Sequence, residues 1–365
     1  ANWTGFIDTV SSIVNYEVAF TDDTSRFDII PSWDSVGLSS NYIIDTLSTL
    51  VDQETYFFVI KATDLAGNVT DVMSSDGITI DYGTPVSGLV YDGLTEDADW
   101  TSSDSTLEIS WSGFIDTVSG IILYEYAIGL TPGDTNVITW TENGVETNAI
   151  VSNLVLIHDS TYYASVRATD AVGHVSTISI SNGIVVDMFD PISGLVYDGL
   201  TEDADWTSSD STLEISWSGF IDTVSGIILY EYAIGTTPGA VNVITWTENG
   251  VDTNAIVSNL DLIHDGTYYA SVRATDAVGH VSTISTSNGI VVDIFDPTVG
   301  VPNDGGSIDL DYQGPSDTLG IFWSGNDTRE ISFYEYSVGT SAGDTNVISW
   351  TDNGSETQVT ISDFS

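Results

Sequence analysis

The sequence predicts an all-β protein made of tandem β-sandwich repeats in a linear array. Two observations lead to this prediction. The segment from Ser87 to Pro191 returns 106 positions later, from Ser193 to Pro297, with only eight changes, and a long repeat of this kind indicates a modular architecture. Within each copy, apolar and polar residues alternate with a period of two, which is typical of strands that bury one face. No segment has the 3.6-residue period of a helix over even three turns.

The alternation is clearest in two stretches of each copy. Leu107, Ile109 and Trp111 alternate with polar residues, and Tyr162 opens a second stretch with the pattern Tyr-x-Ala-x-Val-x-Ala. Turn sequences such as residues 131–133 (Thr-Pro-Gly) separate the alternating runs. Seven short strands in about 106 residues fit an immunoglobulin-like sandwich.

Four copies can be aligned on their tryptophans. Trp111, Trp217 and Trp323 occupy matching positions, and Trp3 begins the equivalent segment of the first copy. We therefore expect repeats at residues 1–83, 84–190, 191–296 and 297–365, the first without its opening strand and the last without its final strands. A proline lies at each boundary, where it fixes φ and favours a short, stiff connection. We expect the chain to be a piece of a longer protein.

Composition excludes several classes of function. The chain has 54 acidic and five basic residues, a formal net charge of −49. Nucleic acids and anionic membranes bind through lysine and arginine, so we expect neither as a partner. We expect no direct membrane insertion, because no run of about eighteen apolar residues is present. No nucleophile with a base, phosphate loop or paired carboxylates in a cleft can be recognised, so we expect no enzyme activity.

Several motifs resemble a known family. The strand tryptophans resemble the core tryptophan of fibronectin type III domains, and Leu156 followed by Tyr162 resembles that family's tyrosine corner. The phrases Trp-Ser-Gly-Phe, Tyr-Glu-Tyr-Ala-Ile-Gly and Arg-Ala-Thr-Asp-Ala-Val-Gly resemble repeats of giant Bacteroidetes-type surface proteins that are exported by type 9 secretion. The resemblance implies seven-stranded fibronectin-III-like sandwiches, adhesion, spacing and filament building, and it implies no catalytic residues.

An acidic loop suggests a calcium site. Asp92 and Gly93 are followed by Asp97 and Asp99, and this spacing recurs in the third and fourth copies. Calcium takes six to eight oxygen ligands, several of which aspartates beside a glycine turn can supply. Linker aspartates, including Asp81, can complete such a site; the alternative is a solvated turn in an acidic protein. The candidate calcium ligands are Asp92, Asp97, Asp99, Asp187, Asp190, Asp198, Asp203, Asp205, Asp304, Asp309 and Asp311.

The scarce basic residues recur at one position. Apart from Arg26, the basic residues of the first three copies are Lys61, Arg167 and Arg273, on the outward face of the sixth strand. Glutamates occupy matching positions on the neighbouring third strand: Glu17, Glu125 and Glu231. We predict a cross-strand ion pair in each copy, with an exposed contact to another chain as the alternative.

Tryptophans outside the core are candidate interface residues, because exposed indoles stack on sugars or anchor protein contacts. Trp33 is the counterpart in the first copy of three tryptophans that precede Asn-Gly turns. The candidates are Trp140, Trp246, Trp350, Trp100 and Trp206, with packing at the edge of the sandwich as the alternative. The four histidines lack zinc-ligand spacing, and His174 matches Asn68 of the first copy, which argues against a required metal ligand.

Tandem copies fit a mechanical or spatial role, because each unit adds length and a repeated surface. We expect a structural shaft segment of a long extracellular filament or adhesin at the cell surface, which attaches to surfaces, cells or prey. The shaft is either a single string of modules or a lateral bundle formed by self-association of parallel copies. Ligands such as glycans would bind domains outside this segment. The alternative is a set of spacer repeats in a secreted polysaccharide-degrading enzyme.

Overall fold

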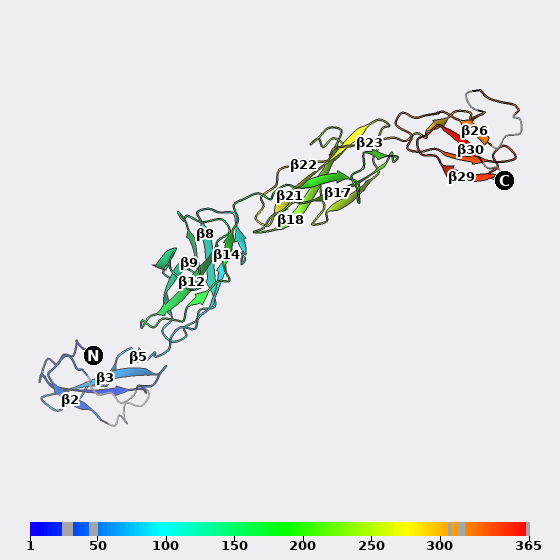
Figure 1. The fold of residues 1–365 in the computed structure, drawn as a ribbon. Helices are drawn as coiled ribbons and strands as arrows, with labels where there is room; N and C mark the ends of the chain where they lie inside the picture. The colour runs from blue at the N-terminus through cyan, green and yellow to red at the C-terminus, as the bar shows by residue number, and fades with distance from the viewer. Residues whose placement is uncertain (24–31, 44–49, 306–307, 313–317, 363–365) are drawn as a thin grey trace. The chain divides into compact units, whose positions relative to one another are not determined.

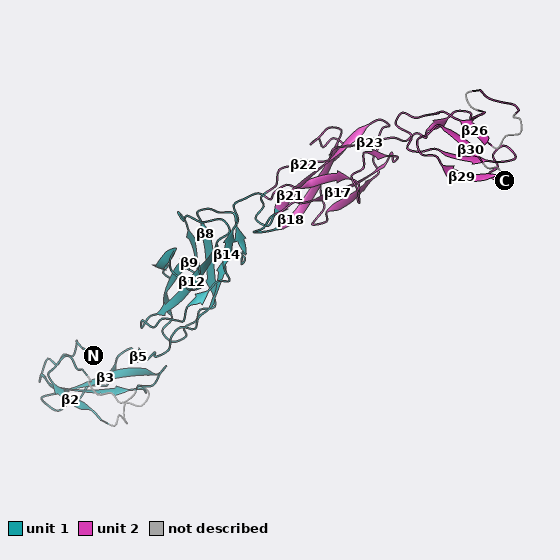
Figure 2. Ribbon diagram, in the orientation of Figure 1, with its two compact units in different colours: residues 1–190, 222–226, 276–280 teal, residues 191–221, 227–275, 281–365 magenta. Residues whose placement is uncertain are grey.

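A computed structural model describes residues 1–23, 32–43, 50–305, 308–312 and 318–362 (Figure 1). All of the regular elements in these residues are strands, which confirms the all-β prediction. The described part therefore offers no helix long and apolar enough to cross a bilayer. The chain divides into two compact units, shown in Figure 2. Unit 1 contains residues 1–190, 222–226 and 276–280, and unit 2 contains residues 191–221, 227–275 and 281–365.

The second repeat, in unit 1, is a two-sheet sandwich. Its larger sheet has the order β10-β9-β12-β14-β7, with β13 also paired to β12, and its smaller sheet has the order β11-β8-β6. The strands are β6 (Leu89–Asp92), β7 (Trp100–Thr101), β8 (Leu107–Ser112), β9 (Ile121–Gly129), β10 (Ile138–Glu142), β11 (Asn148–Val151), β12 (Thr161–Asp170), β13 (Ser179–Ile180) and β14 (Ile184–Val186).

The third repeat has the same two sheets, with the orders β16-β23-β21-β18-β19 and β15-β17-β20, and with β22 paired to β21. Its strands are β15 (Leu195–Asp198), β16 (Trp206–Thr207), β17 (Thr212–Ser218), β18 (Ile227–Gly235), β19 (Ile244–Glu248), β20 (Asn254–Ser258), β21 (Thr267–Asp276), β22 (Ser285–Thr286) and β23 (Ile290–Val292). A three-stranded sheet packed on a larger sheet is the arrangement of a fibronectin-III-like sandwich.

The predicted alternation places the core between the two sheets. Leu107, Ile109 and Trp111 of β8 are buried, and the residues between them are exposed or half-buried. Trp111 meets Tyr124 edge to face, with ring centroids 5.7 Å apart, a geometry that aromatic pairs prefer. The buried Tyr162 hydroxyl accepts a hydrogen bond from the Ile157 backbone N–H at 3.0 Å. This bond confirms the tyrosine corner that the resemblance implied.

The first and fourth repeats contain fewer described strands. The first forms one sheet with the order β2-β1-β3-β4, with β5 also paired to β3, and the fourth forms three small sheets: β24-β27, β25-β26-β30 and β28-β29. The strands are β1 (Ile13–Thr21), β2 (Asp34–Gly37), β3 (Thr55–Asp64), β4 (Met73–Ser74), β5 (Ile78–Thr79), β24 (Thr298–Val299), β25 (Asn303–Asp304), β26 (Thr318–Phe322), β27 (Gly325–Asn326), β28 (Glu335–Val338), β29 (Ile348–Asp352) and β30 (Gln358–Ser362).

The predicted repeat boundaries fall in the connections between strands. The boundary after residue 83 lies between β5 and β6, the boundary after residue 190 between β14 and β15, and the boundary after residue 296 between β23 and β24. The second and third repeats each have a separate apolar core, which draws its buried residues from within the repeat. A core contained within a repeat is what a self-standing module requires.

Candidate functional site

A stack of three side chains lies on the outer face of the larger sheet in the second repeat. Arg167 on β12 lies opposite Glu125 on β9 in the strand register. Its Nε donates to Glu125 Oε2 at 2.7 Å and its Nη2 donates to Oε1 at 2.9 Å. The guanidinium carbon lies 4.4 Å from the ring centroid of Trp140, on β10. One arginine is therefore held by a bidentate ion pair and a cation–π contact together.

The stack recurs in the neighbouring copies. Arg273 makes the same two bonds to Glu231 and lies 4.4 Å from the Trp246 centroid. In the first repeat, Lys61 Nζ lies 3.5 Å from Glu17 Oε2 and 4.3 Å from the Trp33 centroid. The predicted cross-strand pairs are thus confirmed, while Arg26 lies outside the described residues. Hydrogen bonding to Glu125 and Glu231 raises the pKa of Arg167 and of Arg273 above the usual value.

The candidate interface tryptophans have different surroundings. Trp140 and Trp246 are half-buried, each with one ring face against an arginine. Trp350 is 64% exposed, and Trp100 is 37% exposed. Trp206, in unit 2, stacks on Arg329 at 4.6 Å, and Arg329 also donates to Asp265 at 2.8 Å. The structure therefore gives Trp140, Trp246 and Trp206 an intramolecular packing role, and the interface role of all five tryptophans stays a prediction.

The acidic loop is organised by its own aspartates. Asp97 Oδ1 accepts a hydrogen bond from the Asp92 backbone N–H at 2.9 Å. Asp92 is only 1% exposed, and its Oδ2 accepts from the Gly183 N–H at 2.9 Å. Burial raises the pKa of Asp92 to about 6, against the opposing effect of hydrogen bonds from Ser181 and Gly183. Asp92 thus points into the sandwich and braces the turn before β14.

The third repeat repeats this loop, and the fourth keeps part of it. Asp203 accepts from the Asp198 N–H at 2.9 Å, and burial raises the pKa of Asp198 to about 6. Asp309 accepts from the Asp304 N–H at 3.3 Å, although Asp304 is exposed. The remaining candidate ligands of the loops and linkers are exposed: Asp99, Asp190, Asp205 and Asp311.

Calcium binding at the acidic loops stays a prediction. Within the described residues, only two sets of His, Asp or Glu side chains bring three ligand atoms within 4.8 Å of one another. Neither set contains a residue of the acidic loops, but of the linker aspartates Asp81 belongs to one set and Asp187 to the other. Asp92 and Asp198 have a structural role, because their carboxylates point into the sandwich and accept the backbone N–H groups of Gly183 and Gly289.

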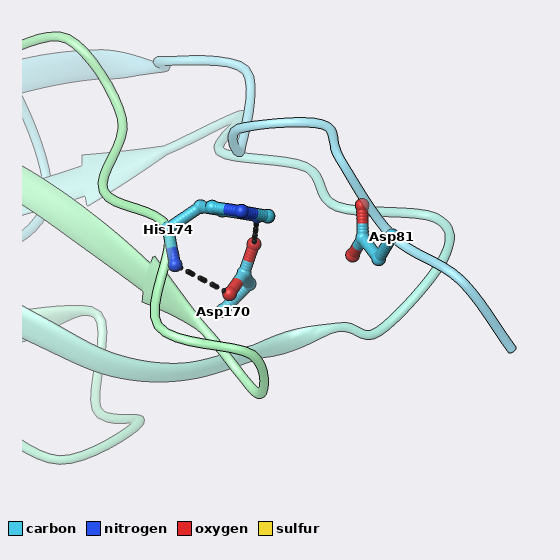
Figure 3. Close-up of side chains that lie close together, drawn as sticks. All are labelled: Asp81, Asp170 and His174. Carbon is cyan, nitrogen blue, oxygen red and sulfur yellow. Dashed lines mark hydrogen bonds and ion pairs between the residues drawn. The ribbon is translucent and has the colours of Figure 1, made fainter. Parts of the chain in front are cut away.

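The first of these sets is Asp81, Asp170 and His174, which we call the first triad (Figure 3). Asp170 ends β12, and its Oδ1 accepts the backbone N–H groups of Val172, Gly173 and His174 at 3.0, 2.7 and 2.8 Å. Burial acts to raise the pKa of Asp170, but these hydrogen bonds outweigh it and hold the pKa below its usual value. The tight loop thus presents an ionised carboxylate.

The other two members of the first triad complete the set. His174 Nδ1 lies 3.1 Å from Asp170 Oδ2. Asp81 belongs to the connection that follows β5, is 8% exposed, and accepts the Gly83 N–H through Oδ1 at 2.9 Å. In Figure 3 the oxygen atoms of Asp81 lie on the side of that residue facing Asp170 and His174.

The second triad is Asp187, Asp276 and His280, all within unit 1. His280 Nδ1 lies 3.2 Å from Asp276 Oδ2. Asp187 Oδ2 accepts the Ser225 hydroxyl at 2.6 Å, so a serine also reaches this group. Asp187 and Asp276 are both fully buried, and the His280 side chain is 23% exposed. The second triad therefore has the same residue types in the same order as the first.

The triads were not predicted from the sequence. The spacing between histidines does not indicate them, because the partners of His174 are carboxylates at positions 81 and 170. The local signal was available in the pattern Asp-Ala-Val-Gly-His, which brings an aspartate and a histidine together in one tight loop. Asp81 was named among the linker aspartates, but its contact with that loop joins segments about 90 positions apart and depends on the fold.

Comparison with curated proteins shows a similarity that extends over most of the chain. No family model matches the chain. Exoglucanase B of Cellulomonas fimi is 24% identical over 356 residues, which cover 95% of this chain and 28% of that protein. The chain thus spans less than a third of the length of this relative.

Three solved structures are similar to the chain, all with low sequence identity and low TM-scores. The FN1–FN3 domains of chicken CNTN1 give a TM-score of 0.32 at 17% identity, covering 80% of this chain and 93% of that one. Fibronectin(III)-like modules of Clostridium thermocellum CbhA give 0.32 at 13% identity, covering 56% and 94%. Domains A168–A170 of titin give 0.38 at 14% identity, covering 79% and 85%. The fold class rests on the strands and sheets of the chain itself.

Proposed function

We propose that this chain is a spacer segment of a larger extracellular protein. The observation that carries the proposal is the repetition of structural side chains from copy to copy. The second and third repeats each have their own core, ion-pair stack and buried loop aspartate. Side chains that are repeated in this way stabilise each module, and the repetition adds length. We expect no catalysis by the segment itself.

A secreted polysaccharide-degrading enzyme is the setting that we favour for the spacer. The similarity to exoglucanase B extends over 95% of this chain and only 28% of that protein. A catalytic domain would then lie outside the segment described here, and the chain would separate it from other domains. The absence of cysteine suits this role, because each module is stabilised by apolar burial rather than by disulfides.

A shaft segment of a surface filament or adhesin is the second candidate. The near-identity of the second and third repeats favours it, because identical surfaces recur at a fixed interval and can pair with a parallel copy. The net charge of −49 opposes such bundling unless cations screen it. Trp350 and Trp100, which are exposed, are then the candidate lateral contacts.

Sedimentation and polysaccharide binding distinguish the two settings. A spacer is expected to remain monomeric with and without millimolar Ca²⁺, and not to bind insoluble cellulose. Deleting the second repeat, residues 84–190, should shorten the particle by one module in solution scattering and leave the remaining modules folded.

Fibres that form with Ca²⁺ and fail to form after Trp350→Ala would support the filament. Cellulose binding that is lost in Trp100→Ala would contradict the spacer proposal.

A further inference from the structure

We propose that the first and second triads each bind a divalent transition-metal cation, for which Zn²⁺ is the probe. The proposal concerns residues outside the acidic loops and does not depend on the spacer function. Each triad offers two carboxylates and one imidazole. Imidazole nitrogen suits zinc and its first-row neighbours, whereas calcium prefers a shell made of oxygen alone. Three protein ligands leave a fourth position for water.

Buried oxygen atoms without partners are the first observation that points to a cation. Asp81 is 8% exposed, and its Oδ2 has no hydrogen-bond partner among the described residues. Asp276 is fully buried, and its Oδ2 also lacks a hydrogen-bond partner there. A buried charged oxygen without a partner is costly, and a bound cation removes that cost. The two oxygens belong to different members of the triads, and their counterparts have partners. Asp187 Oδ2 accepts the Ser225 hydroxyl, and Asp170 Oδ2 lies 3.1 Å from His174 Nδ1.

The distance between imidazole and carboxylate is the second observation. His280 Nδ1 and Asp276 Oδ2 form an ion-pair contact at 3.2 Å, yet neither atom has a hydrogen-bond partner among the described residues. The corresponding distance for His174 and Asp170 is 3.1 Å. Two ligands at about 2.0–2.1 Å from a tetrahedral zinc lie roughly 3.3 Å apart. Both pairs are thus already close to the separation that a shared metal requires.

The loop before each histidine prepares the carboxylate. Asp170 Oδ1 is occupied by three backbone N–H groups, and Asp276 Oδ1 accepts from the N–H groups of Val278 and His280. The loop therefore fixes the rotamer and leaves Oδ2 directed toward the histidine. The His174 side chain is 34% exposed, which gives a cation a path from solvent. Rigid orientation of ligands by a second shell of hydrogen bonds is a feature of built metal sites.

The third ligand comes from two different local sequences. Asp81 follows Ile80 and precedes Tyr82, whereas Asp187 follows Val186 and precedes Met188. An aspartate is nonetheless present at both positions and reaches the loop of its triad. The first repeat shows the opposite case, because Asn68 replaces the histidine and donates to Asp64 Oδ2 at 2.7 Å. The amide of Asn68 supplies the hydrogen bond to the loop aspartate but does not ligate zinc as an imidazole does. We therefore expect no metal site in the first repeat.

Calorimetric titration of the whole chain with Zn²⁺ tests the proposal. A background of millimolar Mg²⁺ competes for the exposed carboxylates, so that only selective sites give saturable heat. We expect two Zn²⁺ ions per chain, one for each triad. Titration with Co²⁺ should give visible absorption bands with the same stoichiometry, because cobalt reports nitrogen and oxygen ligation directly.

The decisive variants exchange the histidine for the residue that the first repeat uses. His174→Asn should reduce the stoichiometry to one and keep the fold, because Asn68 already occupies this loop position in the same chain. His280→Asn should also leave one ion, and the double variant should leave none. Asp81→Asn, which preserves shape and the acceptor for Gly83, should match His174→Asn. Far-ultraviolet circular dichroism without metal shows whether each variant is folded.

His264→Asn is the matched control. His264 also lies beside aspartates, 3.4 Å from Asp293 and 3.6 Å from Asp265, but belongs to neither triad. This variant should keep both sites. The proposal is overturned if the wild-type chain binds no Zn²⁺ selectively over Mg²⁺, if the double variant still binds two ions, or if Ca²⁺ displaces Zn²⁺ at equal concentration.

Discussion

The first and second repeats of unit 1 build the same two features from different residues. In the ion-pair stack, the first repeat uses Lys61 in a single 3.5 Å contact, whereas the second uses Arg167 in two contacts of 2.7 and 2.9 Å. In the loop after the sixth strand, Asn68 in the first repeat stands where the second has His174. In both exchanges the side chain keeps its contact with the glutamate or aspartate. The other contacts that the side chain can make differ between the two repeats.

This difference separates structural from chemical requirements. The stack needs a positive charge between a glutamate and a tryptophan, and lysine meets that need with weaker geometry. The loop needs a donor to an aspartate oxygen, and an amide meets that need as well as an imidazole does. A metal, however, requires the imidazole. Exchanging residues between the two repeats therefore tests each requirement by itself.

The largest expected effect concerns the cores. Among the described residues, Trp111 is 3% exposed inside a large buried cluster, whereas Trp3 belongs to a much smaller one. Trp111→Ala should lower the unfolding free energy of the second repeat by about 3–5 kcal/mol, the usual cost of removing a large buried aromatic. Trp3→Ala should cost less in the first repeat. Urea unfolding of both variants measures the difference, and equal costs would contradict the comparison.

The second effect depends on pH and on Asp92. Burial raises its pKa to about 6 in the folded chain, from an ordinary value of 3.8. The folded state therefore holds this proton more tightly than the unfolded state. The associated stability is complete below about pH 4 and is lost as the pH rises through 6, a change of roughly 3 kcal/mol.

Asp92→Asn removes this penalty, because asparagine is neutral and can still accept the Gly183 N–H. The variant should have a higher unfolding free energy than wild type at pH 8. Between pH 4 and pH 7 its unfolding free energy should fall less than that of wild type, because the contribution of Asp92 is gone. Urea unfolding across that range measures both effects. Glu108→Gln is the control, since it removes one exposed charge on β8. A gain no larger than that of Glu108→Gln would refute the burial of an ionisable carboxyl.

The fold and the stack could be predicted because their signals are local or follow from the strand register. Alternation around Trp111 marks a buried face, and the position of Arg167 opposite Glu125 follows from the order of strands in the sandwich. The role of Asp92 could not be predicted in the same way. An aspartate at the end of a strand looks solvated in the sequence, and only the packed structure shows that it points inward. The triads are less accessible still, because they join a linker to a distant loop.

The third, smaller effect is expected when the basic residues of the stacks are exchanged. Arg167→Lys gives the second repeat the pair that the first repeat has, and it removes the bidentate geometry. We expect a loss of about 0.5–1 kcal/mol. Thermal unfolding at low ionic strength measures it, and Arg273→Lys should give the same value in the third repeat. A stability unchanged in both variants would mean that the second hydrogen bond contributes nothing.

The smallest expected effect concerns the loop histidine without metal. His174→Asn should change the unfolding free energy by no more than about 0.5 kcal/mol in the presence of a chelator, because asparagine can donate to Asp170 as Asn68 donates to Asp64. Chemical denaturation with the chelator measures this. A large loss would show that the imidazole supports the fold itself, and the comparison with the first repeat would then fail.

The tryptophan-covered cations have a consequence for how these molecules meet in solution. Four of the five basic residues of the chain lie against an indole ring and beside a carboxylate: Lys61, Arg167, Arg273 and Arg329. Their positive charge is neutralised within the molecule, and an approaching copy meets an almost purely negative field. At low ionic strength the molecules therefore repel one another, and this repulsion opposes aggregation. That protection ends near the isoelectric pH of about 4.1, where mutual repulsion disappears and the chains are expected to precipitate.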